Sequence, residues 1–195
     1  MFANIKIMSE LTVDWYTKIA PVYDFVCRPL YSKLRRVALR RLNLQGNELL
    51  AEIGCGTGLN MKALAHGAGK VIALDHNSAM LKRAPRKFDN VSYVLGTPSV
   101  LADDSVDVVL LSLVLNIADD WHAVLEDCKR IVKPGGRIVI ADVQPLRGVF
   151  RCCNFFVVPI ANWSGAGDIR RNIWSECSEL ECFGGGYFAV GTINC

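Results

Sequence analysis

The chain lacks the cysteine and histidine patterns that hold structural metals. It has eight cysteines and three histidines, but no Cys-x-x-Cys pair and no zinc-type spacing between cysteine and histidine. It also has no signal-peptide pattern at its N-terminus and no apolar run of the length that a membrane span needs. We therefore expect no metal site and no membrane-spanning helix, and we expect mostly buried, reduced thiols.

The sequence also lacks a strong charge of either sign, internal repeats and low-complexity tracts. Its net charge of +3 does not by itself indicate nucleic-acid binding. A length of 195 residues, of which 51% are apolar, predicts one α/β domain with a sizeable core. With no export signal, we expect a cytoplasmic protein, and peripheral contact with the inner face of a membrane stays an open alternative.

The most informative stretch is 49–60, with the sequence LLAEIGCGTGLN. An apolar strand runs into three glycines at alternate positions, Gly54, Gly56 and Gly58, and a helical pattern follows. Glycine lets the backbone turn sharply and lets a ligand lie against the main chain. The first amides of a helix are free to bind such a ligand. The pattern predicts a small molecule held at the carboxyl end of a strand.

An acidic residue at the end of the next strand narrows the kind of ligand. Asp75 follows the apolar residues 71–74, where a carboxylate can accept hydrogen bonds from both hydroxyls of a ribose. The alternatives are a tight turn without a ligand for the glycines, and a helix N-cap or solvated turn residue for Asp75. A backbone cradle beside a sugar-binding carboxylate favours a nucleoside site over these alternatives.

Apolar strands alternate with helical patterns after two helical stretches at the N-terminus. We expect strands at 49–53, 71–74, 91–95, 106–113, 137–141, 179–183 and 187–193, and helices at 11–25, 30–42, 59–66, 78–84, 121–132 and 168–177. The alternation predicts an α/β protein with a doubly wound, Rossmann-like sheet and helices on both faces. Gly184–Gly186 would form the turn of a final hairpin.

Four segments occur in the order and spacing of the class I S-adenosylmethionine-dependent methyltransferases, which the chain resembles. They are AEIGCGTG at 51–58, ALDHNSAML at 73–81, DVVLLSLVL at 107–115 and RIVKPGGRIVIAD at 130–142. The resemblance implies a seven-stranded, mostly parallel sheet with an antiparallel closing strand, and S-adenosyl-L-methionine as the cofactor. It implies one domain, 1–195, in which about 8–44 form an N-terminal helical lid over a core of about 45–195.

The resemblance also implies roles on the methionine side of the cofactor. The three glycines would line the methionine part, and Glu52 would orient the glycine turn and reach the methionine ammonium. Cys55 occupies the variable position of the turn, and we interpret it as a packing residue and not a nucleophile.

On the adenosine side, Asp75 would hold the ribose hydroxyls. His76 would flank the adenine, and Met80 would pack beside it. Thr97 stands where many members of the family carry an aspartate for the adenine amino group, so only one weaker contact is expected there. Leu113, after the fourth strand, would lie beside the reactive sulfonium.

Methyl transfer itself needs little acid or base help. The sulfonium is already a good leaving group, so the enzyme mainly aligns the reacting atoms and excludes water. The scattered histidines therefore need no catalytic role. An amine acceptor would have to lose a proton, and Tyr16 and Tyr23 are the candidate catalytic residues for positioning it.

The N-terminal region suggests the acceptor. Residues 16–24, YTKIAPVYD, resemble the start of bacterial phospholipid N-methyltransferases of the phosphatidylethanolamine type, and less closely the quinone C-methyltransferases. Within 28–41 there are six basic residues and no acidic one. Such a helix would suit an anionic membrane surface. The equal alternative is a solvated helix whose apolar stripe packs on the sheet.

A second apolar segment, 148–163, could line a lipid-accepting pocket or enter a membrane interface; a buried helix that shields the sheet is slightly favoured. The main prediction is methylation of the headgroup amine of a phospholipid, a small-molecule or lipid acceptor. The alternatives are C- or O-methylation of a quinone or soluble metabolite, and a non-catalytic protein that binds the cofactor. No Asn-Pro-Pro-aromatic signature follows the fourth strand, so no nucleic-acid substrate is expected.

Overall fold

The computed structural model of the chain describes residues 25, 28–163, 167–169 and 171–195. The candidate catalytic residues Tyr16 and Tyr23, and about half of the expected N-terminal lid, lie outside the described residues.

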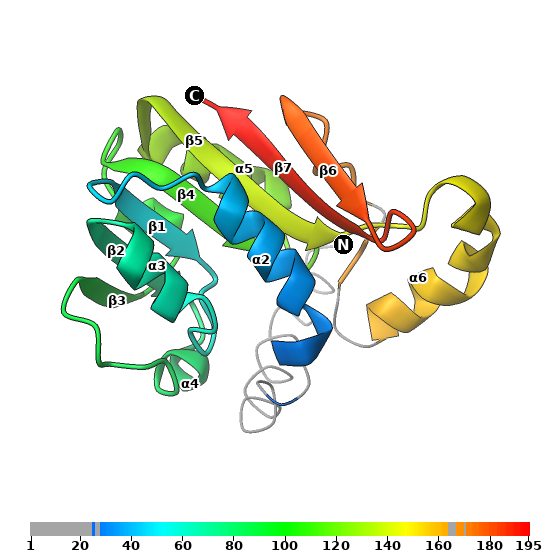
Figure 1. The fold of residues 1–195 in the computed structure, drawn as a ribbon, viewed down its shortest axis with the longest axis horizontal. Helices are drawn as coiled ribbons and strands as arrows, with labels where there is room; N and C mark the ends of the chain where they lie inside the picture. Colours follow the sequence, from blue (N-terminus) through cyan, green and yellow to red (C-terminus); the bar gives the residue numbers. More distant parts are fainter. Residues whose placement is uncertain (1–24, 26–27, 164–166, 170) are drawn as a thin grey trace, which may run out of the picture.

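A seven-stranded sheet forms the centre of the molecule (Figure 1), in the order β3-β2-β1-β4-β5-β7-β6. The strands are β1 (Leu49–Ile53), β2 (Lys70–Asp75), β3 (Val91–Leu95), β4 (Val106–Ser112), β5 (Val132–Val143), β6 (Glu179–Phe183) and β7 (Phe188–Asn194). The first five are parallel, whereas β7 is antiparallel to both β5 and β6. The predicted fold class is confirmed, including the final hairpin around Gly184–Gly186.

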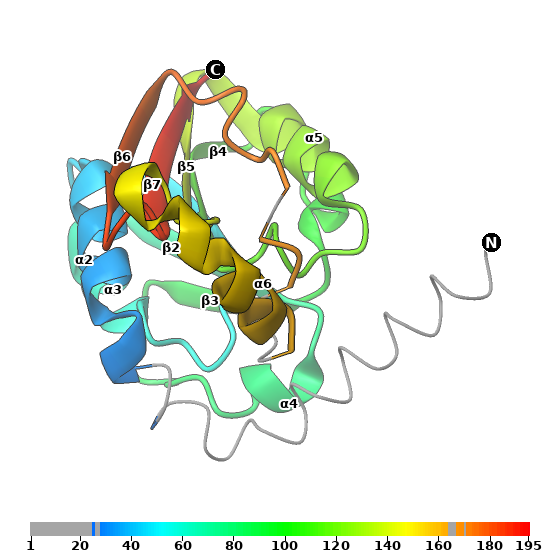
Figure 2. The same ribbon diagram turned by 90° about the vertical axis from the view of Figure 1, so that its right-hand side faces the viewer.

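Helices cover both faces of this sheet, because each central strand is apolar on both sides. On one face, α2 (Ser32–Arg41) and α3 (Met61–Gly67) pack their buried leucines and valines against alternate residues of β1 and β4. On the other face, α5 (Trp121–Ile131) packs Leu125, Cys128 and Ile131 against the intervening residues of the same strands. Figure 1 shows α2 and α3 in front of the sheet, and Figure 2 shows α5 on its opposite side.

The remaining helices are short. They are α4 (Ser78–Leu81) after β2, the 3-10 turns η1 (Pro98–Val100) and η2 (Gly148–Cys153), and α6 (Asn154–Trp163). None of the helices in the described part of the chain is long and apolar enough to cross a bilayer.

One predicted helix, 168–177, is wrong. The described residues of this range form turns that bury Ile169, Ile173 and Trp174 against the core. The segment makes turn hydrogen bonds within itself and also bonds to distant backbone, since the Asp168 N–H donates to the Asn116 carbonyl at 2.9 Å. The guanidinium of Arg171 also donates to the Leu115 carbonyl at 2.8 Å.

The buried helix favoured for 148–163 is also wrong in part. Val158 and Ala161 of α6 are buried, but Phe155, Phe156 and Ile160 on its other side are exposed. In addition, β5 begins earlier than predicted, at Val132, because the Lys133-Pro134-Gly135-Gly136 turn is continuous with the strand.

Candidate active site

The main cavity lies where the winding of the sheet reverses, at the carboxyl ends of β1 and β4. On one side of this point the sheet continues from β1 to β2 and β3, and on the other side from β4 to β5. The crossover connections therefore diverge there and leave a crevice. The cavity has a volume of about 460 Å³. Its walls come from the ends of β1, β2 and β4, the loop after β3 and the start of α5.

The three glycines of the turn after β1 serve different purposes. All three have a left-handed φ, of +67° at Gly54, +56° at Gly56 and +78° at Gly58. A Cβ on Gly54 would lie 2.6 Å from the side chain of Val114, and one on Gly58 would lie 2.7 Å from the ring of Pro85. Nothing lies within 4 Å of a Cβ at Gly56. Gly56 therefore leaves open space at the cavity wall, whereas Gly58 permits close packing and lines neither of the cavities described here.

Asp75 connects the glycine turn to the end of β2. Its carboxylate is buried and accepts hydrogen bonds from the Gly56 N–H at 2.7 Å and from the Asn77 N–H at 2.8 Å. Charge-assisted bonds of this kind hold both backbone segments in place. Because Asp75 also lines the cavity, a carboxylate of fixed orientation faces any ligand there.

The turn after Asp75 shapes the next wall of the cavity. The Asn77 side chain caps α4 by accepting hydrogen bonds from the Ala79 and Met80 amides. This cap places Met80, which is buried, on the cavity wall. His76 also lines the cavity, with its side chain largely exposed and its Nδ1 3.9 Å from the Asp75 carboxylate.

A smaller cavity of about 40 Å³ lies beside the main one, and Gly54, Gly56 and Leu113 line both. Glu52 and Cys55 line only the smaller one. Burial raises the pKa of the Glu52 carboxyl to about 8, and the charge of Asp75 adds to this rise, against the hydrogen bond that Asn60 donates at 2.6 Å. The other Glu52 oxygen is buried without a hydrogen-bond partner in the described structure. A buried acceptor left unpaired in this way favours a donor supplied by a ligand.

The Cys55 thiol is also buried, and this burial raises its pKa. A neutral thiol in such a place agrees with a packing residue, because the thiolate is the reactive form.

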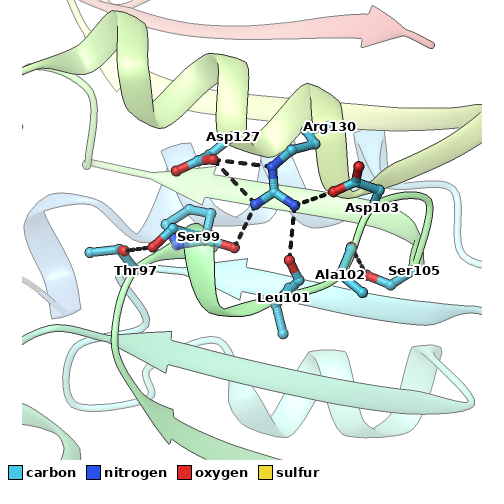
Figure 3. Close-up of polar contacts among 9 residues, drawn as sticks. Thr97, Ser99, Leu101, Ala102, Asp103, Ser105, Asp127 and Arg130 are labelled. Carbon is cyan, nitrogen blue, oxygen red and sulfur yellow. Dashed lines mark hydrogen bonds and ion pairs between the residues drawn. The ribbon is translucent and has the colours of Figure 1, made fainter.

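The loop after β3 forms the far wall of the main cavity and is tied to α5 (Figure 3). Arg130 of α5 donates to the carbonyl of Leu101 at 2.9 Å and to that of Pro98 at 3.4 Å. The same guanidinium pairs with Asp103 at 2.6 Å and with Asp127 at 3.2 Å. One side chain thus holds the whole 98–103 segment against α5.

Thr97 stands at the start of this loop and lines the cavity. Its hydroxyl lies 2.7 Å from that of Ser99, as Figure 3 shows. The Thr97 hydroxyl therefore has a competing hydrogen-bond partner within the protein.

Leu113 follows β4 with a left-handed φ of +60°, which is rare for a residue with a branched side chain. Its N–H donates to the Ala141 carbonyl at 2.8 Å, which keeps it in register with β5. Strained backbone of this kind concentrates at functional sites. With this backbone conformation, Leu113 lies in the wall that both cavities share.

Sequence reasoning missed a polar cluster behind Leu113. The Asn116 amide donates to the Asp142 carboxylate at 2.9 Å and to the Val143 carbonyl at 2.6 Å, and both side chains are buried. Burial raises the pKa of Asp142 to about 6, against the hydrogen bonds from the Val143 and Asn116 amides. The signal was a carboxylate near the end of the apolar strand β5 and an amide shortly after the apolar strand β4.

The comparisons with known proteins agree with this geometry. Residues 51–140 match the methyltransferase domain family. The chain is 28% identical over 176 residues to the demethylmenaquinone methyltransferase of Oceanobacillus iheyensis, covering 83% of this chain and 74% of that protein. It is 34% identical over 119 residues to the demethylmenaquinone methyltransferase of Corynebacterium efficiens, covering 60% of this chain and 51% of that protein.

Among solved structures, the fold is similar to that of DhpI in its complex with SAH, with a TM-score of 0.65, 22% identity and 94% of each chain covered. The fold, the domain match over 51–140 and the named relatives together support an enzyme, an S-adenosylmethionine-dependent methyltransferase. Its cofactor is S-adenosyl-L-methionine. The chain spans about half the length of the Corynebacterium efficiens relative, so this likeness does not assign an acceptor to the chain.

Proposed function

We propose that this enzyme transfers the methyl group of S-adenosylmethionine to a ring carbon of a reduced, lipid-soluble quinone. The two relatives described above act on demethylmenaquinone by their names. They support the quinone alternative over the phospholipid amine that the N-terminal pattern favoured. Small molecules of this kind also fit the main cavity, which has mostly apolar walls around a few polar groups.

We propose that the cofactor occupies both cavities and crosses the glycine turn. The open space at Gly56 lets a ligand approach the backbone, and the unpaired Glu52 oxygen offers an acceptor to the methionine ammonium. The Asp75 carboxylate offers acceptors to the ribose hydroxyls, with His76, Met80 and Thr97 around the adenine. This assignment matches the donor and acceptor needs of each part of the cofactor.

When bound, the cofactor supplies an electrophilic methyl on a sulfonium. The residues of the chain then have three tasks: to fix the cofactor, to hold the acceptor carbon in line with the methyl, and to exclude water. Leu113 lies at the junction of the two cavities, where an apolar side chain keeps water from the reacting atoms.

The acceptor has to be the reduced quinol, because a quinone ring is too electron-poor to attack a methyl group. The ring carbon of the quinol forms the new C–C bond while the S–CH₃ bond breaks and S-adenosylhomocysteine leaves. The proton on the same ring carbon is then lost, which restores the aromatic ring. No oxidant or reductant is consumed in the transfer itself.

The observation that carries the proposal is the apolar, aromatic surface beside Leu113. Tyr31, Val157 and Phe188 pack with Leu113 around the buried cluster of Val143, Val158, Ala161 and Ile169. Such a surface suits a flat, uncharged ring with a hydrocarbon tail. A phosphoryl amine headgroup would instead require cationic and anionic partners at this place.

A lipid-soluble acceptor resides in a bilayer, so we also propose that the enzyme meets its substrate by peripheral contact with a membrane. Tyr16 and Tyr23 remain candidates for positioning the acceptor.

The test is methyl transfer from labelled S-adenosylmethionine by the purified protein. The acceptors, offered one at a time, are a demethylated naphthoquinone with a prenyl tail, with and without a reductant, and phosphatidylethanolamine. We expect label in the naphthoquinol only when the reductant is present. Label in phosphatidylethanolamine alone would restore the amine prediction, and cofactor binding without any transfer would favour a non-catalytic protein.

A further inference from the structure

The segment of η2 and α6 carries a set of large apolar side chains that point to solvent. Val149 is 86% exposed, Phe155 79% and Phe156 67%, while Phe150 and Ile160 are more than half exposed. These five residues lie within twelve positions of the sequence. We call them the outer apolar face. Exposed apolar groups gathered in this way mark an interaction site, whereas isolated ones do not.

The opposite side of α6 is firmly packed, so the outer apolar face is not a product of a loose helix. Val158 and Ala161 are each 3% exposed and pack against Val143 and Ile169. The Asn154 side chain also bonds to both backbone groups of Leu146, at 2.7 and 2.9 Å, which ties the start of α6 to the segment that precedes η2. The packed inner side of α6 therefore fixes the helix, and its other side presents an apolar surface outward.

Basic residues lie within and near the segment that carries the outer apolar face. Arg147 and Arg151 lie within the segment and are exposed, and the sequence has no acidic residue between Asp142 and Asp168. Lys33 of α2 lies 4.9 Å above the ring of Phe183 at the end of β6. Phe183 stacks on Phe188, which packs against the cluster beneath α6. Cations next to exposed aromatic and aliphatic groups match the headgroup and acyl layers of an anionic bilayer.

The outer apolar face lies on the same side of the molecule as the cavity. Val143, which ends β5, packs against the inner side of α6, as does Leu113 of the shared cavity wall. Figures 1 and 2 show α6 beside the carboxyl ends of the central strands. One side of α6 therefore faces the reacting end of the site while the other faces outward.

We propose that the outer apolar face docks on the surface of an anionic bilayer, so that a lipid-soluble acceptor passes along α6 to Leu113. The ten-residue α6 is too short to span a membrane and would lie in the interface. Pairing of two copies through this face would bring like-charged arginines together, which favours the bilayer over a second copy as the occupant. The route for the acceptor rests on the proposed function, but the docking itself does not.

The experiment measures binding of the full chain to sedimented vesicles of phosphatidylcholine with and without phosphatidylglycerol. We expect binding that needs phosphatidylglycerol and is lost in the double variant Phe155→Ser/Phe156→Ser. Arg151→Gln should weaken binding about fivefold, the effect of one basic residue at an anionic surface. The matched controls are Leu95→Ser, an exposed leucine on the opposite edge of the sheet, and Lys70→Gln, at the amino end of β2.

Because the substituted phenylalanines are exposed, the variants should fold and bind S-adenosylhomocysteine as the wild type does. Wild-type protein that stays in solution with both kinds of vesicle would overturn the proposal. So would a shift from dimer to monomer in the double variant with vesicle binding unchanged, because the face would then join two copies. Vesicle binding without any methylation of a quinol would overturn the proposed function and leave the docking surface in place.

Discussion

At the scale of single residues, the glycine turn combines close packing against neighbouring side chains with open space at the cavity wall. Gly54 and Gly58 are needed because a neighbouring side chain occupies the place of a Cβ, whereas Gly56 leaves that place open. The sequence spacing alone predicts the turn and Asp75, because both follow from strand ends and backbone sterics. It does not separate the three glycines, because the neighbours Val114 and Pro85 come from other parts of the chain.

Gly56→Ala should therefore weaken cofactor binding more than it weakens folding. The left-handed φ of an alanine would cost about 1–2 kcal/mol of the free energy of unfolding, and the methyl group would enter the space we assign to the cofactor. We expect the dissociation constant for S-adenosylhomocysteine to rise about tenfold or more, equivalent to about 1.4 kcal/mol, in isothermal titration calorimetry.

Gly135→Ala is the matched control. Gly135 also has a left-handed φ, of +81°, and open space around a Cβ, but it lies in the turn at the start of β5. It should lose similar stability and keep the wild-type affinity. Equal affinity losses in both variants would mean that Gly56 does not face the cofactor.

Glu52 gives a pH-dependent prediction at the same scale. Its folded-state pKa of about 8 lies above the usual 4.5, so the folded protein keeps a proton that the unfolded chain loses. The free energy of unfolding should fall as pH rises between these two values. Asp142, whose pKa is also raised, should contribute to the same fall in the free energy of unfolding as pH rises to about 6. In denaturant titrations, the free energy of unfolding of Glu52→Gln should fall less steeply with pH above pH 6, where Glu52 still contributes and Asp142 no longer does.

Cofactor binding should respond to pH with the opposite sign. The methionine ammonium prefers the ionised Glu52, so affinity for S-adenosylhomocysteine should increase as pH rises toward about 8. In Glu52→Gln this increase should disappear. An affinity profile that is the same in both proteins would remove Glu52 from the cofactor site.

At the scale of elements, the strands and most helices were predictable because their apolar periodicity is local. The segment 168–177 was not, because its geometry depends on hydrogen bonds from Asp168 and Arg171 to carbonyls about fifty residues earlier. For α6, the sequence slightly favoured a buried helix over an exposed apolar one, since a very apolar segment normally becomes core. Such conflicts between local pattern and structure tend to mark functional surfaces.

The contact between α5 and the loop after β3 gives a prediction for these elements. Arg130→Gln removes the guanidinium that bonds to residues of the 98–103 segment. The backbone amides of this loop should therefore exchange hydrogen faster. Affinity for S-adenosylhomocysteine should fall several-fold, because Thr97 and Pro98 line the cavity. Hydrogen exchange with mass spectrometry measures the first effect.

Lys129→Gln is the control for this contact. Lys129 lies on the same helix and pairs with Glu126 and Glu176, away from the loop after β3. Unchanged exchange of 98–103 in Arg130→Gln, or an equal change in Lys129→Gln, would contradict the role of Arg130.

At the scale of the whole molecule, the order of the strands explains why cofactor and acceptor meet where they do. The reversal between β1 and β4 opens the cavity, and the antiparallel β7 brings Phe188 and the hairpin turn beside η2 and α6. The apolar surface beside Leu113 and the outer apolar face thus both follow from this strand order. The alternation of strands and helices predicted a doubly wound sheet, and the family resemblance implied its seven strands and antiparallel closing strand. The acceptor was not predictable, because acceptor specificity depends on contacts outside the cofactor motifs.

The most direct test of the account uses a total membrane lipid extract, reduced beforehand, with the purified protein and methyl-labelled S-adenosylmethionine. The account predicts label in the neutral-lipid fraction, in a product one methylene heavier than the demethylated naphthoquinol substrate. It also predicts loss of that label in Asp75→Asn. Label confined to the polar phospholipids or to water-soluble compounds would contradict it.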